Sequence, residues 1–154
     1  MIALYEWLDS PIIYKDDGAF AAALRDLMPA FYSPIAAGHH YLRMAERTDK
    51  AYMQGETVKL KKYFYVLRPL LAVRWIEQGR GPVPMLFESL LATVADQPEL
   101  IAGINDLLVR KVAGEELDEG PRIEVIDEFQ QSELERLRAT AAKLPAKPTF
   151  AACR

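Results

Sequence analysis

Apolar side chains recur every three or four residues along most of this chain, whereas the strict alternation typical of a half-buried strand is scarce. Proline and glycine divide the chain into segments of helical length, which predicts an all-α fold. The expected helices cover about residues 3–9, 17–28, 34–53, 57–78, 85–94, 96–112 and 121–137. We expect at most one short extended segment, near residues 12–14, because Ile12 follows a serine-proline stop.

The segment 57–78 is the predicted centre of the bundle. Its apolar positions form one stripe, and after the first two turns the opposite side becomes apolar as well, which predicts burial nearly all round. Pro69 lies inside this segment and removes one backbone hydrogen bond, so we expect a kink there, at a cost of about 3 kcal/mol in a plain helix. The pattern therefore predicts a multi-helix bundle around a central kinked helix.

The length of 154 residues is typical of one domain, which we place at residues 1–144, with a flexible tail at 145–154. Cys153 is the single cysteine, so no intrachain disulfide can form and a reducing compartment is favoured. The chain contains no apolar run long enough to cross a membrane and no basic start typical of a signal peptide. These features predict a cytoplasmic protein with no membrane partner.

Charge is balanced overall, with a net charge of -3, but it is unevenly distributed. Residues 59–80 contain six basic side chains and one acidic side chain, whereas residues 115–138 contain nine acidic side chains and three arginines. The net charge alone does not indicate nucleic acid or membrane. The basic segment, which coincides with the central helix, is where an anionic ligand would be expected.

Two features of the central helix suggest an anion-binding surface. On a helical wheel Arg74 falls among apolar positions, where an unpaired guanidinium is costly, so it needs an anionic partner. Lys61 and Arg68 are seven residues apart on one side, where they can converge on a triphosphate or a nucleic-acid backbone, and Tyr65 lies near them. The alternative is an internal salt bridge from Arg74 to an acid near the C-terminus, with the lysines simply solvated. The residues alone leave both readings open.

The sequence contains almost no pattern typical of a metal site or of a catalytic nucleophile. His39 and His40 are adjacent, and consecutive helix residues point about 100° apart, so they are poor ligands for one ion. His39 shares a polar face with Arg43, which favours a solvated histidine over acid-base chemistry. The chain has no glycine-rich phosphate loop and no ordered serine-histidine-aspartate set. We therefore predict no metal site and no catalytic residue in this chain.

Four segments nevertheless carry a family resemblance: LYEWLDSPIIY, FYSPIAAGHHYLRMA, KLKKYFYVLRPLLAVRWIEQGRGPVP and KVAGEELDEGPRIEVIDEF. Together they resemble the predicted bacterial and phage nucleotidyltransferases of the DNA polymerase β superfamily that are associated with RNA repair. The resemblance covers roughly residues 3–137. It implies the C-terminal helical region of such an enzyme, since the Gly-Ser turn and paired aspartates of the N-terminal catalytic core have no counterpart here.

In related enzymes a helical domain closes one side of the nucleotide cleft, so the resemblance implies nucleotide or phosphate contacts. The candidate residues for these contacts are Lys59, Lys61, Lys62, Tyr65, Arg68 and Arg74. Within this set Lys61, Lys62 and Arg68 would hold phosphates. Tyr65 would stack or hydrogen-bond, and Arg74 would anchor the face or reach an acid of the missing core. His39, His40 and Arg43 form a second-rank set lining the same cleft.

The resemblance also implies partners that the chain itself does not hold. A nucleoside triphosphate with Mg²⁺, and RNA, are implied for the full-length enzyme, which would transfer a nucleotidyl group only together with its core. A second hypothesis, from a different class, is a helical interaction or dimerisation module with no catalytic role. In that case the oppositely charged segments 59–80 and 115–138 would pair in a homodimer.

Overall fold

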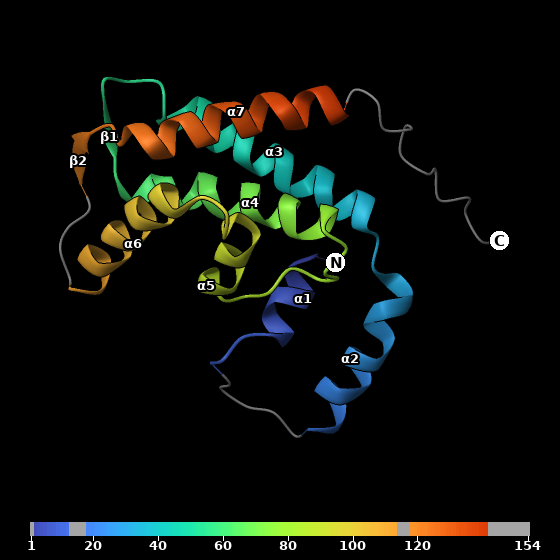
Figure 1. The fold of residues 1–154 in the computed structure, drawn as a ribbon. Coiled ribbons are helices and arrows are strands. Elements are labelled where there is room, and N and C mark those ends of the chain that lie inside the picture. Colours follow the sequence, from blue (N-terminus) through green and yellow to red (C-terminus); the bar gives the residue numbers. More distant parts are fainter. Residues whose placement is uncertain (1, 13–17, 114–117, 142–154) are drawn as a thin grey trace.

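The computed structural model describes residues 2–12, 18–113 and 118–141. The described helices, apart from one short 3-10 helix (η1, Leu91–Val94), are α1 (Ile2–Leu8), α2 (Ala19–Phe31), α3 (Pro34–Tyr52), α4 (Lys61–Glu77), α5 (Phe87–Leu90), α6 (Pro98–Val112) and α7 (Glu124–Ala141). Two strands, β1 (Thr57–Lys59) and β2 (Glu119–Pro121), complete the described elements. The all-α prediction is confirmed, with one small sheet at an edge of the bundle (Figure 1).

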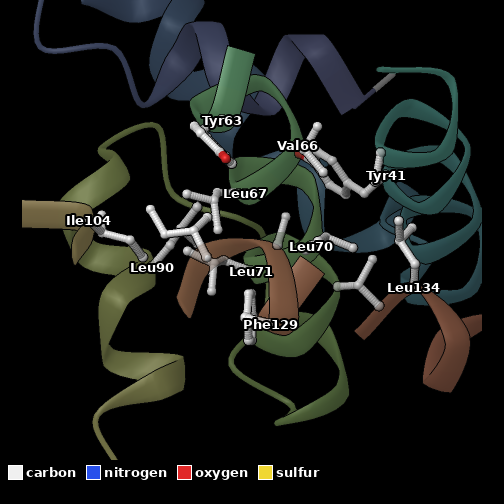
Figure 2. Packing of buried hydrophobic residues seen from close by; sticks show 14 of the residues in the cluster. Tyr41, Tyr63, Val66, Leu67, Leu70, Leu71, Leu90, Ile104, Phe129 and Leu134 are labelled. Carbon is white, nitrogen blue, oxygen red and sulfur yellow. The ribbon is translucent and has the colours of Figure 1, made fainter. Parts of the chain in front are cut away.

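Helix α4 lies at the centre of the bundle, as its pattern predicted. Its inward side chains are fully buried, and they meet residues of α3, α5, α6 and α7 (Figure 2). The α4 residues with no exposed surface are Tyr63, Val66, Leu67, Leu70, Leu71 and Ala72. The helix continues through the buried Pro69 without a break. Packing on all sides of α4 offsets the backbone hydrogen bond that this proline removes.

The first residues of the predicted central helix form strand β1 instead. Thr57–Lys59 pairs antiparallel with Glu119–Pro121, and Val58 is buried between two exposed neighbours. Leu60 extends the hydrogen bonding between the two strand segments by one residue, because its backbone N–H donates to the Asp118 carbonyl at 3.0 Å. The predicted helical start at Thr57 was therefore wrong. A pairing partner some sixty positions away overrides local helix preference, and sequence periodicity cannot reveal such a partner.

Of the extended segment expected near residues 12–14, only the first residue lies in the described part of the chain. Ile12 is not in a strand, and residues 13 and 14 lie outside the described part of the chain. The predicted last helix was also displaced, since Pro121 ends β2 and α7 begins at Glu124.

Helices α1 and α2 lie together on one side of the bundle, away from α7 (Figure 1). The sequence predicts that α2 ends before Pro29 and that Phe20 and Leu27 share its apolar face. The helix instead continues to Phe31, and Phe20 and Leu27 are 69% and 56% exposed. An amphipathic pattern marks a face suited to burial, but it does not say whether the same chain covers that face.

The motif Ser33-Pro34 predicts a capped start for α3, and this prediction is confirmed. The Ser33 side chain accepts a hydrogen bond from the Ala36 backbone N–H at 3.3 Å, and Pro34 occupies the first helical position. The motif Asp96-Gln97-Pro98-Glu99 predicts a capping box at the start of α6. This prediction was wrong, because α6 begins after Gln97 with no side-chain cap. The helix predicted for 85–94 is divided into α5 and η1. None of these differences displaces α3 or α4, which carry the candidate site residues.

Candidate anion-binding surfaces

The three lysines predicted to bind phosphate lie where β1 passes into α4. Lys59 ends the strand and Lys61 begins the helix, and both are exposed, whereas Lys62 is half-buried. The buried Leu60 between them fixes this junction in the core. Within the described residues none of the three lysines forms an ion pair, so their charges are available to an outside anion.

Two tyrosine rings hold the ammonium group of Lys62. Its Nζ atom lies 3.9 Å from the ring centroid of Tyr52, at the end of α3, and 4.8 Å from that of Tyr65 on α4. Both rings are open to solvent, with Tyr52 46% and Tyr65 59% exposed. Cation–π contacts of this kind position a lysine without neutralising it. We call Tyr52, Lys59, Lys61, Lys62 and Tyr65 the Lys62 cluster.

The Lys62 cluster combines two properties that suit a nucleotide. Unpaired ammonium groups attract phosphate oxygens, and exposed aromatic rings can stack on a base. The sequence had singled out Tyr65 but not Tyr52. Tyr52 belongs to a different helix and comes near Lys62 only through the packing of α3 on α4.

Arg68 faces away from solvent, toward α1 and the loop before α5. Its Nη1 donates to the Met85 carbonyl at 2.9 Å, and its Nη2 donates to Glu6 Oε1 and to the Pro84 carbonyl, both at 3.2 Å. Tyr41 donates to the same Glu6 oxygen at 3.0 Å. Burial, and then the neighbouring Glu6 carboxylate, raises the pKa of Tyr41, which keeps the phenol protonated as a donor. Arg68 therefore ties α1 and this loop to the central helix.

Arg74 pairs with an acid near the C-terminus, which is the internal alternative that the sequence left open. Its Nε and Nη2 donate to the two carboxylate oxygens of Glu133 at 2.8 and 3.0 Å. Arg136 donates to the same carboxylate and also to Glu77. Burial raises the pKa of Glu133, but hydrogen bonds from Arg136 and Arg74 outweigh it and hold the pKa below its usual range.

Part of the Arg74 side chain also borders a surface hollow of about 660 Å³ between α6 and α7. The guanidinium lies 5.3 Å from the ring centroid of Phe129, which borders the same hollow. Glu99 and Glu128 line it too, so the hollow carries both signs of charge. This mixture is less suited to a polyanion than the three lysines of the Lys62 cluster.

The second-rank candidates lie on a separate face. His39, His40 and Arg43 line a hollow of about 350 Å³ on the solvent side of α3, together with Arg47. The opposite side of the same helix is buried in the core, through residues such as Ala45. Sequence reasoning missed Arg47, although its position four residues after Arg43 gives the signal. The structure thus divides the predicted residues among several places rather than one cleft.

No group of three or more histidine, cysteine, aspartate or glutamate side chains in the described ranges is arranged to hold a metal ion. The described residues therefore do not fit the two-metal site of nucleotidyl transfer, and no step through a metal is assigned to them. None of the described helices combines the length and apolar character needed to cross a membrane.

The fold is mostly helical, and exposed cations of α3 and α4 form no ion pair within the described residues. The chain belongs to the RNA repair pathway DNA polymerase beta family, whose model matches residues 3–152. The matched span covers nearly the whole chain. It is longer than the range of about residues 3–137 over which the sequence motifs carry the resemblance. The family assignment is thus confirmed.

A relative with a curated sequence supports the same assignment. The chain is 46% identical over 144 residues to the uncharacterized protein YcgL of Bacillus subtilis (strain 168). The match covers 94% of this chain and 55% of YcgL, so the chain spans about half the length of that relative. No solved structure matches the chain.

Proposed function

We propose that this chain is the helical, nucleotide-contacting region of a nucleotidyltransferase. The observation that carries the proposal is the Lys62 cluster, in which the Lys62 ammonium group lies over two exposed tyrosine rings and forms no ion pair among the described residues. The family membership supports it, because polymerase β-type enzymes transfer a nucleotidyl group from a nucleoside triphosphate. In this proposal a core outside the chain supplies the metal-binding carboxylates, and Mg²⁺ acts there.

Within the cluster the residues have separate roles. Lys61 and Lys62 neutralise phosphate oxygens, and Lys59 adds to the positive field at the end of β1. Tyr65 offers its exposed ring to the base, and Tyr52 helps Lys62 to keep its position. Arg68 and Arg74 act through the fold, since their guanidinium groups are engaged by Glu6 and Glu133. This assignment narrows the six residues expected from the resemblance to four, and it adds Tyr52.

Calorimetric titration of the chain with nucleoside triphosphates and Mg²⁺, at two salt concentrations, tests the proposal. We expect saturable, salt-sensitive binding that Lys61→Ala/Lys62→Ala weakens by at least about tenfold, because two phosphate contacts are lost. Arg80→Ala/Lys111→Ala is the matched control, since it removes two positive charges as well. Arg80 lies 5.2 Å from the Trp75 ring centroid and Lys111 5.1 Å from the Phe64 centroid. Absence of binding, or an equal loss in the control, contradicts the assignment of a nucleotide contact to this cluster.

An interaction or dimerisation module is the second candidate function, and one observation favours it. Helices α1 and α2 expose large apolar side chains: Trp7 is 72%, Phe20 69% and Phe31 60% accessible. Apolar surface of this kind is typical of a contact with another chain. Sedimentation velocity over a wide concentration range distinguishes the candidates, because a dimerisation module must associate. A monomer at every concentration rejects the homodimer.

A further inference from the structure

A hollow opens between α3, α4 and α7, at the opposite end of α3 and α4 from the Lys62 cluster. Its volume is about 270 Å³, and its accessible lining is almost entirely apolar. The lining includes Ile35 and Leu42 of α3, Val73 of α4 and Leu137 of α7. A cavity of about 150 Å³ is enough to take up a benzene ring, so this hollow has room for one aromatic side chain. We call it the apolar hollow.

Gly38 keeps the apolar hollow open. It lines the hollow from inside α3, where glycine is less favourable than alanine. A Cβ added at this position would meet open space, with no neighbouring atom within 4 Å, and the φ angle of Gly38 is not positive. Neither close packing nor backbone conformation in the described chain therefore requires a glycine here. Its missing side chain leaves room for a side chain of another molecule.

An exposed aromatic ring projects from the chain next to this hollow. Phe31, the last residue of α2, is 60% exposed, and Leu27, one turn before it, is 56% exposed. Ile35, which lines the hollow, is itself 42% exposed. Phe31 and Ile35 are four residues apart, so their Cα atoms are separated by at most about 14 Å. An apolar projection and an apolar hollow are thus neighbours on one surface.

A two-fold contact between identical chains needs a self-complementary surface, and a projection beside a hollow provides one. When two copies meet about a two-fold axis, the projection of each copy faces the hollow of the other. The exposed side chains and the lining of the hollow offer about 400 Å² of apolar surface per copy. Since about 60% of a protein interface is apolar, two copies would bury about 1,300 Å² in total, within the range of specific interfaces.

Charges at the edges of this surface favour the same pairing. Asp26 is exposed beside Leu27 on α2, and Arg43 is exposed on α3, one turn after His39, which lines the hollow. Neither Asp26 nor Arg43 forms an ion pair with another described residue. The projecting side therefore carries an unpaired carboxylate, and the receiving side carries an unpaired guanidinium group. Opposite charges of this kind help to orient two surfaces that meet.

We propose that this surface is an interface between two copies of the chain, in which the Phe31 ring of each copy fills the apolar hollow of the other. The proposal rests on the second candidate function, the interaction module, and deepens it by naming the partner and the contact. It differs from the sequence-based hypothesis, in which the charged segments 59–80 and 115–138 pair. It does not depend on the nucleotide contact, because the Lys62 cluster lies at the other end of α3 and α4.

Sedimentation velocity at concentrations from about 1 μM to about 500 μM tests the proposal on the chain itself. We expect an equilibrium between monomer and dimer. Phe31→Ser removes the projecting ring and Gly38→Leu fills the hollow, so each should raise the dissociation constant at least about tenfold. Trp7→Ser is the matched control, because Trp7 is 72% exposed on α1 and does not line the hollow. This control should associate like the wild type.

Urea denaturation, at a concentration where all the proteins are monomeric, separates loss of the contact from loss of the fold. Gly38→Leu should unfold at the same or a higher urea concentration than the wild type, because leucine favours a helix more than glycine does and the new side chain meets open space. Phe31→Ser should remain folded, because most of the Phe31 ring is already exposed. Loss of the dimer in both folded variants supports the interface.

The proposal and the second candidate function can fail separately. A dimer that survives both Phe31→Ser and Gly38→Leu overturns this interface and leaves the interaction module intact. An equal loss in Trp7→Ser means general apolar association and also overturns the interface. A wild type that stays monomeric at every concentration rejects the homodimer altogether. If Gly38→Leu then also lowers the free energy of unfolding, a segment of the same chain occupies the hollow instead.

Discussion

The arginines of this protein fall into two groups, according to whether a carboxylate among the described residues pairs with them. Arg74 and Arg136 meet Glu133, which is only 2% exposed, at the contact between α4 and α7. Arg43 and Arg47 lie in the open on α3 and have no carboxylate partner among the residues described. A charge paired in the interior holds the fold together, and an unpaired charge at the surface is free for a ligand. The predictions below test whether this division is real.

Glu133 should have the largest effect on stability. Glu133→Gln leaves the partly buried Arg74 without its anion, whereas the exposed Arg136 keeps Glu77, so we expect a loss of about 3 kcal/mol in the free energy of unfolding. Denaturation with urea measures this value. The control is Glu46→Gln, which breaks the exposed pair with Arg138 and should cost less than about 0.5 kcal/mol. Equal losses in the two variants would remove the distinction between the groups.

Tyr63 should have the next largest effect, because its hydroxyl group links α4 to the start of α7. The hydroxyl donates to Asp127 Oδ1 at 3.1 Å and accepts from the Ile123 backbone N–H at 2.9 Å. Tyr63→Phe leaves that N–H without its partner, at an expected cost of about 2 kcal/mol in unfolding free energy. Urea denaturation of the two proteins side by side provides the measurement, and a change below about 0.5 kcal/mol would contradict the role of this link.

The sequence predicted the central helix and the need of Arg74 for an anion, because both follow from the local pattern of apolar positions. It could not identify Glu133 as the partner, since many acids follow residue 114 and only the packing of α7 on α4 selects one. Strand β1 and the position of Tyr52 beside Lys62 were missed for the same reason. Local periodicity determines which face is buried, whereas pairing between distant segments depends on the whole fold.

For the candidate site, too, the local sequence pattern could not show which distant residues contact a side chain. Lys59 and Lys61 are exposed and Lys62 is half-buried, at the junction of β1 and α4. Arg68 was grouped with them because it shares a side of the helix, but α1 and the loop before α5 engage its guanidinium. A helical wheel gives the direction of a side chain and not what lies opposite. Neighbouring elements therefore separate binding candidates from structural ones.

Substitution of Asp49 should have the smallest effect on stability. The pKa of this buried carboxyl group is shifted in the opposite direction to that of Glu133. Both carboxylates are buried, but one Asp49 oxygen, Oδ1, has no hydrogen-bond partner. Burial raises the pKa of Asp49, although Arg138 and Arg122 act in the opposite direction. The ionised form is therefore disfavoured in the folded state, whereas the ionised form of Glu133 is favoured.

The two carboxylates should give opposite pH dependence. A raised folded pKa means that the Asp49 contribution destabilises the fold at neutral pH and is relieved as the pH falls through the folded pKa. The lowered pKa of Glu133 gives a stabilising contribution that is present above its unfolded pKa and lost as the pH falls through the folded one. Asp49→Asn should therefore raise the unfolding free energy at pH 7, by less than about 1 kcal/mol, and flatten its dependence on pH.

Urea denaturation between pH 7 and pH 3 measures both contributions. In the wild type, protonation of Asp49 on mild acidification should raise the unfolding free energy, and this rise should be absent in Asp49→Asn. Protonation of Glu133 at lower pH should reduce the unfolding free energy of the wild type, and this reduction should be absent in Glu133→Gln. If Asp49→Asn instead destabilises the protein at pH 7, then the ionised carboxylate near Arg122 and Arg138 stabilises the fold. Asp49 would then belong with Glu133, and pairing alone, without full hydrogen bonding, would be enough to hold a charge in this interior.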